Sequence, residues 1–277
     1  MSCPLDHVIY MTSPGELQET IRRFQELGFE VIPGGKHADG LTENALVVLE
    51  DGVYIEVIHF VRPLAKYPEG SSEWESRRTH WWASAKENGW IDYCLGDLTG
   101  PDDVPIGTTL NERAKEKSIN LEYDRGVEGG RIKPDGEALR WFVTFPAKQH
   151  IRGSVPFFCK DLTPRSRRVP WDTARASPVN KVRIAALTLK TQPESFARYR
   201  SELSTVLGVP QESTEDGQDD RTALWKLSSP ASTGSMELYL QCAEGTEEID
   251  WVQSVSGIGL WEVLFRRTDS EGATFRL

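Results

Sequence analysis

The sequence predicts an α+β protein built from repeated β-α-β-β-β modules. The first 60 residues place one amphipathic segment among short apolar, β-branched runs, and the same order recurs from residue 90 and from residue 181. A single unit of this size has too small a core to stand alone. We therefore expect two modules to pack their curved sheets around a shared cavity, with a third module at the C-terminal end.

The first module begins with the strand LDHVIY at residues 5–10, which Ser-Pro-Gly closes. A helix over about 15–27 follows, because apolar residues recur there at spacings of three and four and Gly28 supplies a C-terminal stop. After it come FEVIP, a glycine-rich bend GGKHADG, and two apolar runs that flank Asp51-Gly52. An Asp-Gly pair between such runs predicts a hairpin.

The later modules repeat this order more loosely. WIDYCLG, a helix near 107–118, and strands at 139–146 and 154–161 form the second, while KVRIAALTLK, a helix from Pro193 and three strands form the third. The predicted organisation is a domain over 1–165 (modules 1–61 and 90–165), a linker over 166–180 and a third module over 181–277. Because three modules leave one without an internal partner, we also expect homodimerisation through the C-terminal module.

The connection over residues 62–89 is predicted to be a bridging helix. The segment SSEWESRRTHWWASAKENG places Trp74, Arg77 and Trp81 at helical spacing behind a Ser cap. Successive helical side chains diverge by about 100°, so Trp81 and Trp82 cannot both face the same core. Trp81 is accordingly a candidate for lining a ligand pocket, and ordinary helix packing is the alternative.

Composition and missing motifs exclude several classes of function. Lys and Arg total 32 against 42 Asp and Glu, a net charge of −10 that disfavours nucleic-acid binding. The four cysteines show no CxxC spacing, and no window is apolar enough to span a membrane. No GxGxxG, GxxxxGK[ST] or GxSxG motif occurs, so no nucleotide cofactor is expected. The simplest interpretation is a cytoplasmic protein whose partner is a small molecule, with no membrane partner.

LDHVIY, a helix ending in LGF, GGKH followed by TENAL, and DGVYIEVI occur in that order, and the set resembles the glyoxalase-like domain family of the vicinal oxygen chelate superfamily. The similarity covers about residues 4–165 and includes GWIDYCL, DGEALRWFVTFP and SVPFF. It implies paired modules that form an incomplete barrel around a divalent metal or a small ligand. The implied function is a lyase or isomerase acting on a polar or aromatic metabolite, and the alternative is a metal-free protein that binds or sequesters its ligand.

The resemblance places the metal ligands at His7 and Glu56. Strand alternation agrees, because His7 shares a face with Ile9 and Glu56 shares one with Ile58. A carboxylate in an apolar strand is costly to bury without a partner, which a metal, a histidinium or an arginine can supply. Imidazole and carboxylate together suit a divalent ion such as Zn, Mn, Fe, Ni or Mg.

The second module departs from the family pattern. Tyr93 occupies the position where another histidine or glutamine would lie, and on the fourth strand only Cys159 or Asp161 can correspond. Ring-cleaving dioxygenases of the superfamily need two histidines and a carboxylate, and only one histidine aligns here. A lactoylglutathione lyase would need four ligands. The sequence argues against both reactions, and we keep Tyr93 as a candidate catalytic residue beside Glu56.

Three further residues are candidates with open alternatives. His37, in the glycine-rich GGKHADG segment, is a third metal ligand, a general base or an exposed loop histidine. Asn44 either hydrogen-bonds a substrate carbonyl or caps a turn. Arg140 either clamps a substrate carboxylate or forms a salt bridge with Glu56.

Overall fold

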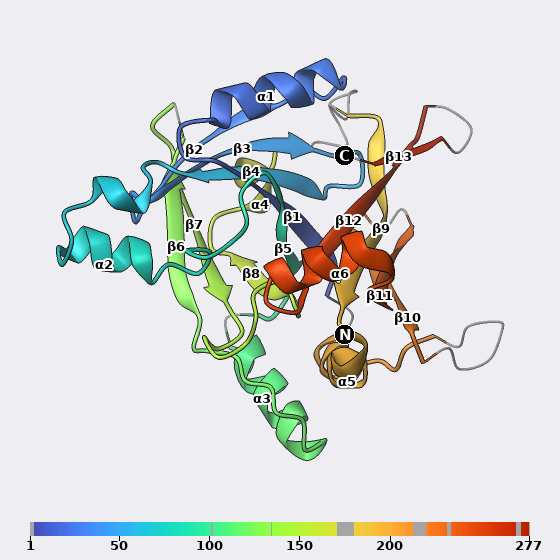
Figure 1. Ribbon diagram of the computed structural model, residues 1–277. Helices are drawn as coiled ribbons and strands as arrows, with labels where there is room; N and C mark the ends of the chain where they lie inside the picture. Colours follow the sequence, from blue (N-terminus) through green and yellow to red (C-terminus); the bar gives the residue numbers. More distant parts are fainter. Residues whose placement is uncertain are drawn as a thin grey trace.

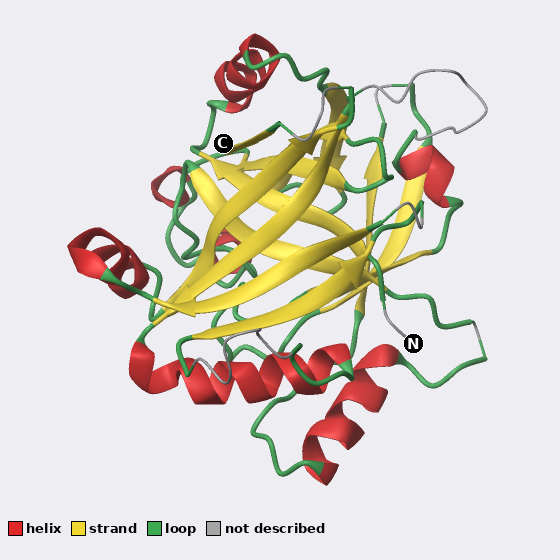
Figure 2. Ribbon diagram, turned by 90° about the vertical axis from the view of Figure 1, so that its right-hand side faces the viewer, coloured by secondary structure: helices red, strands yellow, loops and turns green. Residues whose placement is uncertain are grey.

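The computed structural model describes residues 3–100, 102–133, 135–170, 180–212, 220–231, 234–269 and 273–276. Within these ranges the strands form two sheets, an eight-stranded closed barrel and a five-stranded sheet. The strands gather in the middle of the molecule and the helices lie around them (Figures 1 and 2). No helix in the described part of the chain is long and apolar enough to cross a membrane.

Module one follows the predicted order and comprises β1 (Leu5–Thr12), α1 (Leu17–Glu26), β2 (Ile32–His37), β3 (Thr42–Val48) and β4 (Tyr54–Phe60). The hairpin expected at Asp51-Gly52 joins β3 to β4, which run antiparallel. Helix α1 buries Leu17 and Phe24, two of the residues on its apolar face. Gly28 follows it with φ +89°, a backbone conformation that favours glycine.

Module two repeats the order with β5 (Gly89–Gly96), α3 (Ile106–Glu116), β6 (Val127–Ile132), β7 (Ala138–Thr144) and β8 (Phe157–Asp161). The strand order β1-β4-β3-β2-β6-β7-β8-β5 closes on itself. This confirms the predicted α+β fold of paired modules. The barrel closes where an incomplete one was expected, because β5 pairs with β1 and a short β2–β6 junction pairs Lys36 with Ile132 and His37 with Arg131.

Part of the glycine-rich segment is strand, and this differs from the predicted bend. Gly34 and Gly35 lie within β2, and the turn comes only after His37. A Cβ atom on Gly34 would lie 1.9 Å from Oδ1 of Asn44, and Gly35 has φ +130° beside a register shift. The glycines therefore allow β2 to approach β3 closely, and they place His37 in the sheet.

The bridging segment contains a short 3₁₀ turn, η1 (Leu64–Lys66), and a helix, α2 (Ser72–Arg78). The predicted Ser cap is present, since Ser71 Oγ accepts a hydrogen bond of 3.1 Å from the Trp74 backbone N–H. The helix is shorter than expected, and residues 79–84 are not helical. Helical divergence therefore does not separate the two tryptophans: Trp81 and Trp82 both pack on Phe145, inside the barrel.

The C-terminal half contains α4 (Arg165–Arg168), β9 (Val182–Thr191), η2 (Pro193–Ser195), α5 (Phe196–Leu207), β10 (Thr222–Ser228), β11 (Ser235–Cys242), α6 (Gly245–Ser254), β12 (Ile258–Arg267) and β13 (Thr274–Arg276). Its sheet has the order β10-β11-β9-β12-β13. The strand-helix-strand-strand-strand order agrees with the expectation for 181–277, with α6 and β13 in addition.

The C-terminal sheet packs against the outside of the barrel. The ring of Phe265 lies 6.1 Å from that of Phe29 and 6.2 Å from that of Trp90, measured between centroids. Buried residues of both sheets belong to one continuous apolar cluster. The third module thus packs against the barrel of its own chain. The homodimer, which we expect on the ground that the third module has no internal partner, stays a prediction.

The predicted linker over 166–180 is anchored at both of its described ends. Residues 171–179 lie outside the described part of the chain. On one side Arg168 is buried, with 3% of its surface exposed. On the other, the Asn180 side-chain amide donates to the Val48 carbonyl at 2.8 Å and accepts from the Glu30 backbone N–H at 2.9 Å.

Candidate functional site

The barrel encloses a cavity of about 290 Å³ that both modules and the segment after α2 line. Its polar lining includes His7, His37, Thr42, Asn44, Glu56 and Arg131, and its aromatic lining includes Trp81, Trp82, Trp141, Phe145 and Phe157. A concave site with aromatic walls and a few convergent polar groups is typical of small-molecule binding.

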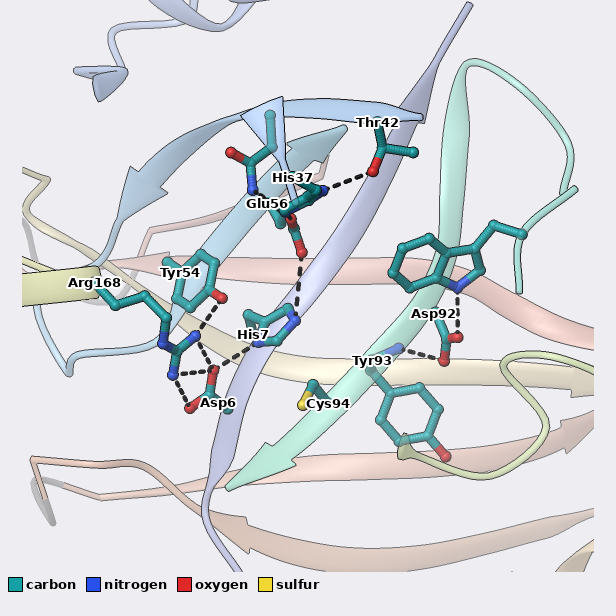
Figure 3. Close-up of polar contacts among 12 residues, drawn as sticks. Asp6, His7, His37, Thr42, Tyr54, Glu56, Asp92, Tyr93, Cys94 and Arg168 are labelled. Atoms are coloured by element: carbon teal, nitrogen blue, oxygen red, sulfur yellow. Dashed lines mark hydrogen bonds and ion pairs between the residues drawn. The ribbon is translucent and has the colours of Figure 1, made fainter. Parts of the chain in front are cut away.

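Two imidazoles face one carboxylate in this cavity. Nε2 of His7, from β1, lies 3.5 Å from Oε2 of Glu56, from β4, and Nε2 of His37, from β2, lies 3.5 Å from Oε1 of the same group. All three side chains are largely buried. Figure 3 shows Glu56 between the two histidines. The structure thus brings His7 and Glu56 together, and it places His37 beside them and not on an exposed loop, which was one of the alternatives for this residue.

His7 is held by its neighbours on two sides. Its Nδ1 hydrogen-bonds Oδ1 of Asp6 at 2.6 Å, and its ring stacks on Tyr54 with centroids 4.6 Å apart. A carboxylate on one ring nitrogen fixes the tautomer and directs the other nitrogen toward its partner. Asp6 therefore turns Nε2 of His7 into the cavity.

His37 is neutral and similarly oriented. Its Nδ1 lies 2.6 Å from Oγ1 of Thr42, and the Asn44 amide nitrogen lies 3.3 Å from its Nε2. Burial lowers the pKa of His37 despite the nearby charge of Glu56. With the ring proton on Nδ1, donated to Thr42, Nε2 carries a lone pair, which is what a metal ligand or a general base requires.

Glu56 is ionised although it is buried. Burial acts to raise its pKa, but electrostatic interactions with the His7 and His37 imidazoles and a hydrogen bond from the Asn44 amide lower it below its ordinary value. Asn44 therefore acts inside the site on the carboxylate, and not as the turn cap that the sequence left open.

A buried ion-pair network supports the site from behind. Asp6 accepts hydrogen bonds from both Arg165 and Arg168, and Arg168 also donates to Oδ1 of Asp161 at 2.6 Å and to the Tyr54 hydroxyl at 2.6 Å. Burial acts to raise the pKa of Asp6, but the two guanidinium groups hold it well below its ordinary value. Arg165 is the last residue of the predicted domain and Arg168 falls in the predicted linker, and no local pattern marks either as a site residue.

The arginine of the cavity is Arg131, and not the predicted Arg140. The Arg140 side chain is 60% exposed and pairs with Glu128 on the surface. Arg131 is 5% exposed, and its guanidinium donates to Oδ1 of Asn44 at 3.2 Å and to the Arg168 carbonyl at 3.0 Å. Its Nε–H has no acceptor among the described residues. Residue type and the neighbouring tryptophan pointed to Arg140, whereas the β2–β6 junction selects Arg131.

Tyr93 lies on the outer side of the barrel, away from the cavity. It is fully buried among residues that pack against the C-terminal sheet, and Figure 3 shows its ring pointing away from His7 and Glu56. The inward position opposite His7 belongs to Cys94. Register shifts occur on both sides of this β1–β5 segment. The residue opposite His7 is therefore one position further along than the sequence alignment of the two modules predicts, and a shift by one residue moves a side chain to the other face of a strand.

Two overlapping groups of donors line this part of the barrel. His7, His37 and Glu56 supply two imidazole nitrogens and a carboxylate, a common ligand set for divalent metals, and Asp6 and Thr42 orient the rings from behind. Among the described residues, the three potential ligands whose donor atoms all lie within 4.8 Å of one another are those of Asp6, His7 and Cys94. There, however, both Asp6 oxygens already accept from arginines, and burial raises the pKa of Cys94 well above its ordinary value.

Comparison with models of protein families shows to which family the chain belongs. The profile of the glyoxalase-like domain matches residues 5–207, which is most of the sequence. The chain belongs to the glyoxalase-like domain family. This confirms the resemblance to the vicinal oxygen chelate superfamily. The match continues past residue 165, so it takes in α4, β9 and α5.

Solved structures resemble this glyoxalase-like domain in fold. A hypothetical protein from Staphylococcus aureus has 13% sequence identity and a TM-score of 0.64, over 98% of this chain and 97% of that one. A mutant of 4-hydroxymandelate synthase from Streptomyces coelicolor has 10% identity and a TM-score of 0.50, over 96% and 71% of the two chains. A search of curated proteins found no match.

Proposed function

We propose that this glyoxalase-like domain is a small-molecule enzyme of the lyase or isomerase type, with a divalent metal held by His7, His37 and Glu56. The observation that carries the proposal is the ionised carboxylate of Glu56 between two imidazole Nε2 atoms, each 3.5 Å from one of its oxygens. A bound divalent ion would polarise a carbonyl or enolate oxygen of the substrate.

The remaining lining indicates the substrate class. Arg131 contributes a buried guanidinium to the cavity lining, and its positive charge suits a carboxylate or another anionic oxygen of the substrate. Trp81 is stacked on Phe145 at 4.3 Å and contributes to an aromatic wall. We infer a polar metabolite that carries a carbonyl group, with an aromatic or other flat part against this wall.

Metal content tests the proposal directly. The purified protein, expressed with added divalent metals, should contain about one ion per chain by elemental analysis, and His7→Ala, His37→Ala and Glu56→Gln should each lose it. His150→Ala is the matched control, because His150 does not line this cavity, and it should retain the ion. Absence of metal from the wild-type protein, or equal metal in all variants, would exclude the proposed site.

The alternative is a metal-free protein of the same fold that binds or sequesters an aromatic compound. It is favoured by the second module, whose inward positions include Cys94, Phe157 and Cys159 and, among its described residues, no histidine that lines the cavity; its carboxylate in the lining, Glu128, pairs with Arg140. A thermal-shift screen followed by analysis of the hits separates the two. Hits that are consumed indicate catalysis, and hits recovered unchanged indicate sequestration.

The reaction itself is open to one revision. We disfavoured oxygenase chemistry because only one histidine aligned with the family pattern, yet His37 supplies a second imidazole beside Glu56. Two histidines and one carboxylate also form the ligand set of non-haem iron(II) oxygenases. If the iron-loaded protein takes up oxygen with a substrate found in the screen, an oxygenase replaces the lyase or isomerase assignment. If product forms without oxygen, the lyase or isomerase assignment is supported.

A further inference from the structure

A second cavity of about 310 Å³ lies on the other side of the Trp81–Trp82 segment. Its lining residues come from α6, the start of β12, the chain between α2 and β5, and the loop after β7. Trp81 and Trp82 line both this cavity and the one that holds Glu56. The proposed reaction makes no use of the second cavity.

The charges along this cavity are all of one sign. Its lining includes Lys86, Lys148 and Arg152, and it contains no aspartate or glutamate. The Arg152 guanidinium lies 4.7 Å from the centre of the Trp81 ring and donates to the Pro146 carbonyl at 2.6 Å. Within the described ranges none of these three cations forms an ion pair with a carboxylate. Their carboxylate partners are longer-range ones, Asp92 and Asp124 for Arg152 and Glu75 for Lys148, so part of their charge is available to a ligand.

The walls between these cations are aromatic and fixed in position. Trp251 of α6 packs edge-on against Trp261 at 4.9 Å, and it lies so close to Gly259 that a Cβ atom there would come within 2.9 Å of the indole. Trp90, which is 8% exposed and also lines the cavity, has an indole N–H without an acceptor in the described part of the chain. Flat apolar surfaces beside unpaired cations suit a ligand with a ring and an anionic group.

We propose that this second cavity binds a planar organic anion, with the ring against the indoles and the anionic group on Lys86, Lys148 and Arg152. The ligand class is an aryl or heteroaryl carboxylate or phosphate. This site does not depend on a metal, and it does not require that the proposed reaction takes place, because its residues do not include His7, His37 or Glu56.

Calorimetry with naphthyl phosphate, and with naphthol as the neutral counterpart, tests the proposal on the full chain. The wild-type protein should bind the phosphate at least tenfold more tightly than naphthol. Lys86→Gln combined with Lys148→Gln should weaken phosphate binding at least tenfold, since each hydrogen bond to a charged group is worth about one to two powers of ten in affinity. Both lysines are exposed, so this variant should fold.

Three further variants make the assignment specific. Lys66→Gln removes an exposed charge elsewhere and should bind as the wild type does. Arg152→Gln should weaken binding and Arg152→Lys should restore part of it, which loss of the Pro146 contact alone would not produce. Glu56→Gln, in the first cavity, should leave phosphate binding unchanged.

The proposal is overturned by any of three results. These are no binding of naphthyl phosphate at millimolar concentration, equal binding of the phosphate and of naphthol, or binding that Glu56→Gln changes and the lysine variant does not. The last result would place the probe in the first cavity. Metal loss from the His7 variant would still be measurable in that case, so failure here is distinct from failure of the proposed function.

Discussion

The orientation of the His7 ring depends on residues behind it. Asp6 hydrogen-bonds the ring, and Arg165 and Arg168 in turn hold Asp6. Arg168 is 3% exposed and shared between Asp6 and Asp161. A charge so deeply buried is tolerated only when its partners remain, and removing one partner of a buried pair costs about 3–5 kcal/mol. The orientation of the His7 imidazole is thus coupled to the stability of the fold.

Arg168→Ala should lower the free energy of unfolding by about 3–5 kcal/mol. The substitution leaves Asp161 without its short contact to the guanidinium and leaves Asp6 with Arg165 alone. Urea denaturation followed by tryptophan fluorescence measures the change. Arg167→Ala is the matched control, because the exposed ion pair that Arg167 forms with Glu137 should contribute only about 0–1 kcal/mol.

The same pair gives a pH dependence with a definite sign. The pKa of Asp6 is held well below its ordinary value in the folded state, so its contribution to stability is complete above the unfolded pKa of about 3.9. That contribution is lost as the pH falls through the folded pKa. The stability gap between wild type and Arg168→Ala should therefore narrow in acid, and a gap that widens there would contradict the assignment.

At the scale of elements, the junction between β2 and β6 positions two of the cavity residues, His37 and Arg131. It has only two register pairs, and one of them joins His37 to Arg131. Gly34 makes this possible, because a side chain there would collide with Asn44 and move β2 away from β3. Strand spacing therefore controls the distance between His37 and Glu56.

Gly34→Ala should destabilise the protein by about 1–3 kcal/mol through overpacking and should also weaken metal binding. The added methyl group displaces Asn44, which hydrogen-bonds Glu56. Gly89→Ala is the matched control, since a Cβ atom at Gly89 meets nothing within 4 Å. Thermal unfolding and metal titration measure the two effects. Equal behaviour of the two variants would show that the close approach has no functional consequence.

At the scale of the whole molecule, one apolar cluster joins the barrel to the C-terminal sheet. The outward faces of β1 and β5 are covered by this sheet, which explains why Val8 and Tyr93 have no exposed surface. A barrel without the sheet would expose these faces to water, and burial of apolar surface is the main favourable term in folding. The two sheets should accordingly unfold together.

Phe265→Ala should lower the stability of the entire chain by about 3–5 kcal/mol, in a single transition. Phe265 is fully buried and its ring contacts Phe29 and Trp90 from the barrel side. Calorimetry and tryptophan fluorescence should give coincident transitions. Leu162→Ala, at a side chain that is 46% exposed, serves as the control and should change little. Separate transitions for the two sheets would show that the interface is not cooperative.

Most elements could be predicted from local patterns, whereas several site residues could not. Helix α1 and the β3–β4 hairpin follow from apolar spacing and the Asp-Gly turn, which act over a few residues. His7 and Glu56 were found because strand alternation and family resemblance agree on them. Tyr93 and Arg140 were misplaced, because register shifts and strand pairing decide which face a side chain occupies.

The sequence by itself determined the order of strands and helices, the modular repeat, and the imidazole and carboxylate of the first module. These depend on periodicity and turn chemistry, which neighbouring residues carry. Only the tertiary structure decided that His37 joins Glu56, that Arg131 lines the cavity, and that Arg168 is buried against Asp6 across more than 160 residues of chain. Such contacts arise from barrel closure, which no local pattern records.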